Sequence, residues 1–173
     1  MEKVKLYQGK TPAVEPLISV IVDTYNHGQF LLEAIKSVLQ QKVSNGEIQI
    51  IVVDDGSTDA ESIYSALSVS HPEITFIVKQ NGGQASAFNV AAPYANGKYV
   101  AFLDGDDVWV EGKLQRIVDT FTAFPQVGFV GHAIEEFYLN GNSRVVKPEA
   151  EFGFKIGVDD GLSKFLRSRC FMG

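Results

Sequence analysis

The sequence predicts an α/β fold in which helices flank a mostly parallel, mixed β-sheet. Short apolar runs alternate with stretches whose apolar residues recur every three or four positions, the patterns of strands and of amphipathic helices. Several of these runs end directly in loops rich in Asp and Asn. Strands and helices that alternate at this spacing form βαβ units, which place such loops along one edge of a parallel sheet.

The first half of the chain contains three predicted strands. Each strand is an apolar run closed by polar residues, and each helix between them carries an apolar stripe. Asn45-Gly46 predicts the turn between the first helix and the second strand. In order, the predicted elements are a leader over 1–15, a strand over 17–22, a helix over 29–41, a strand over 48–53, a helix from Ser57–Asp59 to about Ser70, and a strand over 74–78.

The second half begins with the same alternation. The small residues Ala85, Ala87, Ala91 and Ala92 predict a helix that packs closely on the sheet, and Val100–Leu103 predicts a strand buried on both faces. A hairpin further along the chain is expected to make the sheet mixed. In order, the predicted elements are helices over 84–94 and 111–124 on either side of the strand over 100–103, strands over 127–138 and 144–146 joined by an Asn140-Gly141 turn, an extended segment over 149–154, and a helix over 159–167.

Three carboxylates follow the strand over 100–103 in the stretch FLDGDD, at Asp104, Asp106 and Asp107. Paired carboxylates at a strand's carboxyl end suggest a hard cation, Mg²⁺ or Mn²⁺, bound together with a substrate's phosphates. Gly105 is expected to leave room for the phosphate or the metal to approach the backbone. The other interpretation is an acidic loop that caps the next helix. Repulsion among three acids favours the metal, with Asp106 as its central ligand.

Asp54 and Asp55 end the second strand within the stretch DDGSTD. A carboxylate at this edge can accept the N3 hydrogen of a uracil ring, which presents one donor between two carbonyls. The same stretch is also a good helix start, and its spacing leaves both interpretations open. Tyr25, in the loop after the first strand, either stacks on a base or is a partly buried loop aromatic.

Composition and motifs exclude several classes of function. The net charge of −6 argues against a nucleic-acid partner, and the absence of a GxGxxG fingerprint argues against a nicotinamide cofactor. His27, His71 and His132 lie in separate segments and receive no role. No apolar run reaches the ~20 residues that cross a bilayer, so we expect a soluble, cytoplasmic chain. Its apolar C-terminus suggests a piece of a longer protein, whose membrane association stays open.

The chain carries four motifs in order, VIVDTYN, VVDDGSTD, NGGQASAFN and FLDGDDVW. Over about residues 16–124 it thereby resembles the family 2 glycosyltransferases of the GT-A fold. The resemblance implies a Rossmann-like nucleotide-diphospho-sugar transferase fold, with 16–173 as a donor-binding part cut short at its C-terminus. It implies transfer of a sugar, with inversion, from a metal-bound nucleoside-diphosphate sugar, UDP favoured, to the hydroxyl of a glycan or lipid-linked acceptor. Mn²⁺ or Mg²⁺ is the implied cofactor, and cell-surface polysaccharide biosynthesis is the implied setting.

The resemblance also implies roles for single residues. Asp23 and Tyr25 would line the base pocket, and Asp55 would read the base edge. Asp104 would contact the ribose or the sugar and, with Asp106, hold the metal. The residues implied to bind the nucleotide sugar are Asp23, Tyr25, Asn26, Asp54, Asp55, Asn81, Gln84, Asn89, Asp104 and Asp106. In two departures, Asp23 stands where many relatives have Pro or Ala, and Phe88 where many have an Arg that helps to bind phosphate.

The general base of this family is an Asp or Glu that deprotonates the acceptor hydroxyl. Glu135, Glu136, Asp159 and Asp160 lie in about the right half of the chain, but nothing marks one of them, and we expect the base beyond Gly173. The chain is therefore predicted to bind the donor and to transfer sugar poorly. Two rivals stay open: a haloacid-dehalogenase-like phosphatase, whose DxD motif normally opens its domain, and a non-catalytic module that binds a nucleotide sugar.

Overall fold

The computed structural model describes residues 4–7, 9–10, 14–58, 64, 67, 70–138 and 140–146. The chain divides into two compact units, Met1–Arg116 and Ile117–Gly173. Among the described residues, no helix combines the length and the apolar character that crossing a membrane requires.

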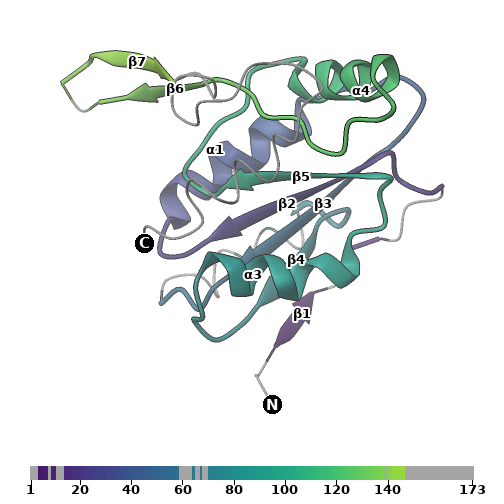
Figure 1. Cartoon of the computed structure of the whole chain (residues 1–173). Coiled ribbons are helices and arrows are strands. Elements are labelled where there is room, and N and C mark those ends of the chain that lie inside the picture. The colour runs from purple at the N-terminus through teal and green to yellow at the C-terminus, as the bar shows by residue number, and fades with distance from the viewer. Residues whose placement is uncertain are drawn as a thin grey trace. The chain divides into compact units, whose positions relative to one another are not determined.

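A five-stranded sheet forms the centre of the first unit, in the order β1-β4-β3-β2-β5 (Figure 1). Strands β2 to β5 pair in parallel, and β1 pairs antiparallel with β4. The mostly parallel, mixed sheet is therefore confirmed. The strands are β1 Lys5–Tyr7, β2 Ile18–Thr24, β3 Ile48–Asp54, β4 Thr75–Val78 and β5 Tyr99–Asp104.

The source of the mixed pairing differs from the prediction. The antiparallel strand is β1, which lies within the stretch expected to be a leader, so for these three residues the leader is wrong. Strand β1 cannot be predicted from periodicity, because three residues are too few to show an alternating pattern. The predicted hairpin contributes no strand to this sheet.

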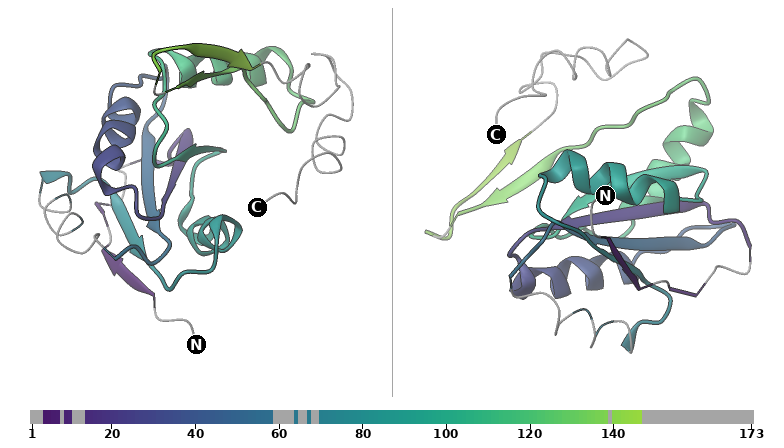
Figure 2. Two further views of the ribbon diagram at one scale, coloured as in Figure 1. Left: turned by 90° about the vertical axis from the view of Figure 1, so that its left-hand side faces the viewer. Right: turned by 90° about the horizontal axis from the view of Figure 1, so that it is seen from below.

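Helices α1 (Gly28–Leu39) and α3 (Gln84–Ala91) cover opposite faces of the sheet (Figure 2). The apolar stripe predicted for α1 is confirmed at Leu31, Ala34 and Val38, which are fully buried, but it is wrong at Phe30 and Leu39, which are 45% and 37% exposed. Helix α3 continues into a short 3-10 turn, η1 (Ala92–Tyr94). Of the helix predicted from Ser57–Asp59 to about Ser70, the described residues Tyr64, Leu67 and Ser70 are helical. Helix α4 spans Lys113–Ala123.

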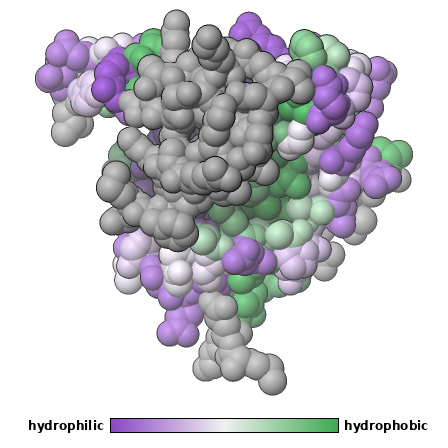
Figure 3. All heavy atoms as spheres, viewed as in Figure 1, coloured by the Kyte–Doolittle hydropathy of each residue, from purple (hydrophilic) through white to green (hydrophobic). Residues whose placement is uncertain are grey.

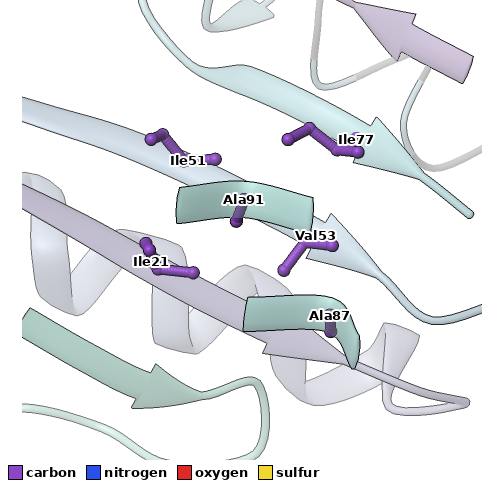
Figure 4. Packing of buried hydrophobic residues seen from close by; sticks show 6 residues of the cluster. All are labelled: Ile21, Ile51, Val53, Ile77, Ala87 and Ala91. Atoms are coloured by element: carbon purple, nitrogen blue, oxygen red, sulfur yellow. The ribbon is translucent and has the colours of Figure 1, made fainter. Parts of the chain in front are cut away.

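The core beneath α3 joins two alanines of the helix to branched side chains of three parallel strands (Figure 4). Ala87 and Ala91 are fully buried there, which confirms the predicted close packing for these two positions. Ala85 and Ala92 are exposed, so the prediction is wrong for them. The strand residues of this cluster are Ile21, Ile51, Val53 and Ile77.

Strand β5 is not buried on both faces, contrary to the prediction from its continuous apolar run. It is the last strand of the sheet, with Val100 45% and Phe102 53% exposed. Helix α3 reaches this face of β5 through Phe88, whose ring centroid lies 4.8 Å from that of Phe102. Figure 3 shows apolar residues at the surface near the middle of this view, beside residues drawn grey.

In the second unit, β6 (Ile134–Phe137) and β7 (Ser143–Val146) form a separate antiparallel hairpin. The hairpin is confirmed, but the strand predicted to begin at Val127 is wrong, because residues 127–133 are not in a strand. Gly128 and Gly131 interrupt that stretch, and glycine weakens strand formation. The predicted elements over 149–154 and 159–167 lie outside the described residues.

Candidate functional site

The acidic ends of the parallel strands meet at one edge of the sheet, as predicted. In the strand register Asp23 of β2 lies opposite Asp104 of β5, and Thr24 of β2 lies opposite Asp54 of β3. Residues far apart in the sequence thereby become neighbours, because parallel strands all present their carboxyl ends on the same side. Five of the six described acids at these strand ends, all except Asp107, fall into two groups with different surroundings.

The first group is built on β2 and β5. The Gln84 amide, at the first residue of α3, donates from Nε2 to Asp104 Oδ1 at 3.0 Å and to Asp23 Oδ1 at 3.4 Å. Burial, and after it the charge of Asp104, raise the pKa of Asp23 to about 6. Burial, and after it the charge of Asp106, raise the pKa of Asp104. In both groups burial is the larger cause of the raised pKa, and repulsion from a neighbouring carboxylate adds to it.

Asp106 belongs to the same group and points toward the loop that follows β2. Its Oδ1 lies 3.7 Å from His27 Nδ1, with both side chains partly exposed. No role was predicted for His27, although its position two residues after Tyr25 in a strand-end loop is a usable signal. A protonated His27 would offset part of the charge of Asp106.

The fit of a metal ion can be judged from these donors. Among the described residues, no group of three or more His, Cys, Asp or Glu side chains is arranged to hold a metal. Asp104 and Asp106 both keep surface exposed to solvent, although neighbouring groups partly bury the Asp104 carboxylate. Carboxylates are the ligand type that Mg²⁺ and Mn²⁺ prefer. They fit a hard cation that takes its remaining oxygens from phosphates or water.

Gly105 has a different role from the one predicted. It is buried, and a Cβ at this position would lie 2.7 Å from the Asp23 carbonyl oxygen and 2.9 Å from Thr24 Cβ. The space that the missing side chain leaves is therefore filled by the end of β2, and the expectation of room for a ligand is wrong. Glycine is needed here because β2 and the β5 loop approach each other closely.

The second group lies at the end of β3, where the chain itself binds the acids. Asp55 is buried, and its carboxylate accepts hydrogen bonds from Lys79 Nζ (2.6 Å) and from the backbone amides of Gly82 and Gly83. Asp54, also buried, accepts bonds from the Ser57 backbone amide and hydroxyl. These contacts form a turn at the end of β3, in which residues 55–58 are not helical, so the helix-start interpretation stays a prediction.

The assignment of Asp55 to the base edge stays a prediction. It requires that the Asp55 carboxylate can accept a hydrogen bond from a base in addition to the bonds that the chain makes to it. The Gly82 amide bonds to both carboxylate oxygens, at 3.0 and 3.1 Å. A base N–H could bond to one of these two oxygens while the Gly82 amide keeps its bond to the other. A carboxylate has about four acceptor positions, so Asp55 can accept this additional bond.

Asn26 and Tyr25 form the tip of the loop after β2. Asn26 has a φ of +55°; its backbone amide donates to Ser57 Oγ at 2.7 Å, and its Oδ1 accepts from the Thr58 amide at 3.1 Å. Asn26 therefore joins the β2 loop to the β3 loop. Tyr25 is 46% exposed, so its ring is accessible for stacking, and that role stays a prediction.

The remaining predicted residues lie on or before α3. Asn81 is exposed in the loop that leads to the helix, and its backbone nitrogen lies close to Gly56 of the β3 loop. Asn89 is exposed five residues after Gln84, about 140° around the helix. The structure therefore brings Gln84 to the acids but turns Asn89 away from them. Phe88, in place of the family's Arg, packs on Phe102.

The candidate general bases in the hairpin have partners within it. Glu135 accepts a bond from the Ser143 hydroxyl at 2.7 Å. Glu136 lies 3.2 Å from Arg144 Nε and accepts a bond from the Tyr138 hydroxyl at 2.8 Å. Asp159 and Asp160 lie outside the described residues. No carboxylate of the described hairpin is thereby marked as a base.

Two solved structures share this fold. PcManGT, a mannosyltransferase from Pyrobaculum calidifontis in complex with GDP-Man and Mn²⁺, gives a TM-score of 0.60 at 26% identity over 72% of this chain and 37% of that chain. TarS of S. aureus in complex with UDP-GlcNAc gives a TM-score of 0.55 at 26% identity over 72% of this chain and 41% of that chain. The mixed sheet and its likeness to these two solved structures confirm that the chain has a GT-A glycosyltransferase fold.

Relatives in sequence define the family within that class. The model of glycosyl transferase family 2 matches residues 19–172. An uncharacterized glycosyltransferase of Nostoc sp. is 40% identical over 144 residues, 82% of this chain and 43% of that protein. A UDP-Glc:alpha-D-GlcNAc-diphosphoundecaprenol beta-1,3-glucosyltransferase of Escherichia coli is 37% identical over 100 residues, 57% of this chain and 38% of that protein.

The chain belongs to glycosyltransferase family 2, which confirms the resemblance found in its motifs. This membership sets aside the haloacid-dehalogenase-like phosphatase. The chain spans less than half the length of the two relatives and of the two solved neighbours.

Proposed function

We propose that the chain binds a nucleoside-diphosphate sugar at the acidic edge of its sheet, and that the protein transfers the sugar, with inversion, to an acceptor hydroxyl. The observation that carries this proposal is the meeting of Asp23, Asp104 and the Gln84 amide at the ends of β2, β5 and α3. Carboxylates and one amide at such an edge can hold the hydroxyls of a ribose or a sugar.

The proposed metal site consists of Asp106 and Asp104. The pKa values of Asp23 and Asp104 are raised first by burial and second by repulsion from a neighbouring acid. They support the metal site because a cation would offset the repulsive part. Bound there with the donor, Mn²⁺ or Mg²⁺ would neutralise charge on the diphosphate. The packing of Phe88 on Phe102 leaves that position without the cationic side chain of many relatives, so the metal carries more of this neutralisation.

UDP is the favoured nucleotide. The N3 hydrogen of uracil matches a carboxylate acceptor such as Asp55, and the exposed Tyr25 ring lies in the neighbouring loop for stacking. Among similar proteins, the E. coli relative is named for UDP-Glc and TarS was solved with UDP-GlcNAc. PcManGT was solved with GDP-Man, so guanine, which also presents a ring N–H, is the alternative to test.

A glycan or lipid-linked acceptor is proposed from the same relatives. The diphosphoundecaprenol in the name of the E. coli enzyme is lipid-linked, and an acceptor of this class would place the reaction at a membrane surface. We assign the general base to a residue outside the described hairpin, since Glu135 and Glu136 are both engaged there.

Isothermal titration calorimetry tests the proposal with UDP, GDP and their sugars, with and without Mn²⁺. The wild-type chain is expected to bind a UDP-sugar in the presence of Mn²⁺, and Asp106→Asn is expected to weaken this binding at least about tenfold. Glu111→Gln, which removes the same charge from an exposed carboxylate nearby, is the matched control and should bind as the wild type does. Absence of binding for every nucleotide would refute the proposal.

A further inference from the structure

A buried lysine holds the second group of acids, and neither the sequence motifs nor the proposed donor contacts give it a role. The side chain of Lys79 is 0% exposed and that of Asp55 is 5% exposed, and their ion pair is 2.6 Å long. Lys79 Nζ also donates to the Gln80 carbonyl at 2.6 Å. Burying two charges is costly unless they are paired and hydrogen-bonded. Because both buried charges have such partners here, the ion pair indicates a specific structural role.

The pair reaches the loop that leads into α3. Asp55 Oδ2 accepts a bond from the Gly83 amide at 2.6 Å, and the Gly82 amide bonds to both oxygens. Lys79 thus holds the carboxylate from one side, and the loop amides bind it from the other. Gly82 permits this approach, because a Cβ there would lie 3.0 Å from Lys79 Nζ and 2.8 Å from Ser86 Oγ.

The loop in turn sets the position of Gln84, whose side chain joins the acids of β2 and β5. Gly83, with a φ of +84°, turns the chain into α3, and the next residue is Gln84. The Gln84 amide then donates to Asp104 and Asp23. A continuous series of hydrogen bonds and one peptide bond therefore connects buried Lys79 to the exposed acids at which we propose that the donor binds.

The geometry points to Lys79 as a positioning residue: by holding the Asp55 carboxylate against the Gly82 and Gly83 amides, it fixes the loop that presents Gln84 to the donor. Lys79 itself touches no donor. This inference rests on the proposed function for its effect on donor binding, but the fixing of the loop is independent of any ligand. Lys79 directly follows β4, and Asp55 directly follows its parallel neighbour β3, whose last residue Asp54 pairs with Val78, so the sequence also carries a signal for this ion pair.

The first measurement is amide hydrogen exchange by NMR on the full chain without ligand. Lys79→Met keeps most of the length of the side chain and removes its charge, and exchange at Gly82 and Gly83 is expected to rise by roughly tenfold or more. Gln41→Ala serves as a control for general loss of stability, because Gln41 lies in a separate buried network. That control should leave the two glycine amides as they are in the wild type.

The second measurement separates positioning from stability by a double-mutant cycle on donor affinity. Lys79→Met is expected to weaken binding of a UDP-sugar by about tenfold in the wild-type background. In the Gln84→Ala background its effect should become smaller, because the part that Lys79 transmits through Gln84 is lost while the part that acts through Asp55, the proposed base-edge acceptor, remains. A merely structural lysine would lower affinity equally in both backgrounds.

Lys79→Met leaves Asp55 buried without its cation, and this variant can fail to fold. The double variant Lys79→Met with Asp55→Asn removes both charges and takes its place, with exchange at Gly82 and Gly83 again expected to rise. Unchanged exchange, or equal losses of affinity in the two backgrounds, overturns the inference. If the wild type binds no donor, the proposed function fails, while the exchange result still decides whether Lys79 fixes the loop.

Discussion

Gln41 holds the segment that follows the acids of β5, and its replacement gives a prediction whose size can be worked out from the structure. Its side chain is 5% exposed, directly after α1. Nε2 donates to the Ser37 carbonyl at 3.1 Å and to the Val110 carbonyl at 3.0 Å, and Oε1 accepts from the Leu114 amide at 3.2 Å. Leu114 lies in the first turn of α4, where amides have no partner within the helix.

Gln41→Ala removes all three of these bonds. The buried Leu114 amide is left without its acceptor, which costs about 1–3 kcal/mol, and each bond to a carbonyl contributes about 0.5–1.5 kcal/mol. Val110 is exposed, so water replaces part of what its carbonyl loses. We expect the free energy of unfolding to fall by about 2–3 kcal/mol.

Urea denaturation followed by circular dichroism and by fluorescence measures this loss. Trp109 is the chain's single tryptophan and donates its backbone amide to Ser37 Oγ beside this network, so the fluorescence reports the affected region. Gln40→Ala changes the exposed neighbour and should stay within about 0.5 kcal/mol of the wild type. Equal stabilities of the two variants would refute the assignment of this network to stability.

Two further predictions concern the acidic edge. Burial, and then the charge of Asp104, raise the pKa of Asp23 from 3.8 to about 6, so the metal-free protein loses stability as the pH rises through this range. Asp23→Asn should therefore raise the melting temperature in EDTA more at pH 8 than at pH 4, and equal shifts would contradict the cause given. Gly83→Ala and Gly112→Ala, with φ of +84° and +77° and open space for a Cβ, should each cost about 1 kcal/mol in denaturation. Calorimetry should show weaker donor binding for Gly83→Ala alone, and equal affinities would refute the role of the loop.

Local signals in the sequence were sufficient for most of the sheet. An apolar run that ends in acids marks a buried strand and its carboxyl end at once, and runs of this kind found β2, β3 and β5 to within two residues. Parallel pairing then requires that their acids share an edge. The strand order, which places Asp23 opposite Asp104, depends on contacts between distant segments.

The features that the sequence did not predict are non-local. The exposure of Phe102 follows from the place of β5 at the end of the sheet, since the same apolar run would be covered in a central strand. Strand β1 exists because β4 offers it an edge. The role of Gly105 depends on the approach of Thr24 from another strand. Each of these residue types occurs in several structural environments. The contact with a segment distant in the sequence determines which environment the residue has here.

The acids at this edge of the sheet differ in their surroundings, and this difference locates the proposed metal site more narrowly than the sequence does. In the sequence they are equivalent carboxylates at strand ends, but Asp55 is buried and neutralised by Lys79 and two amides. At the other strand pair, Asp23 and Asp104 receive one neutral amide, from Gln84, and their pKa values are raised. The charged forms of Asp23 and Asp104 are therefore disfavoured between β2 and β5, by burial first and by repulsion between neighbouring acids second. A divalent cation would be attracted to the carboxyl ends of β2 and β5, which supports the proposed placement of the metal on Asp104 and Asp106.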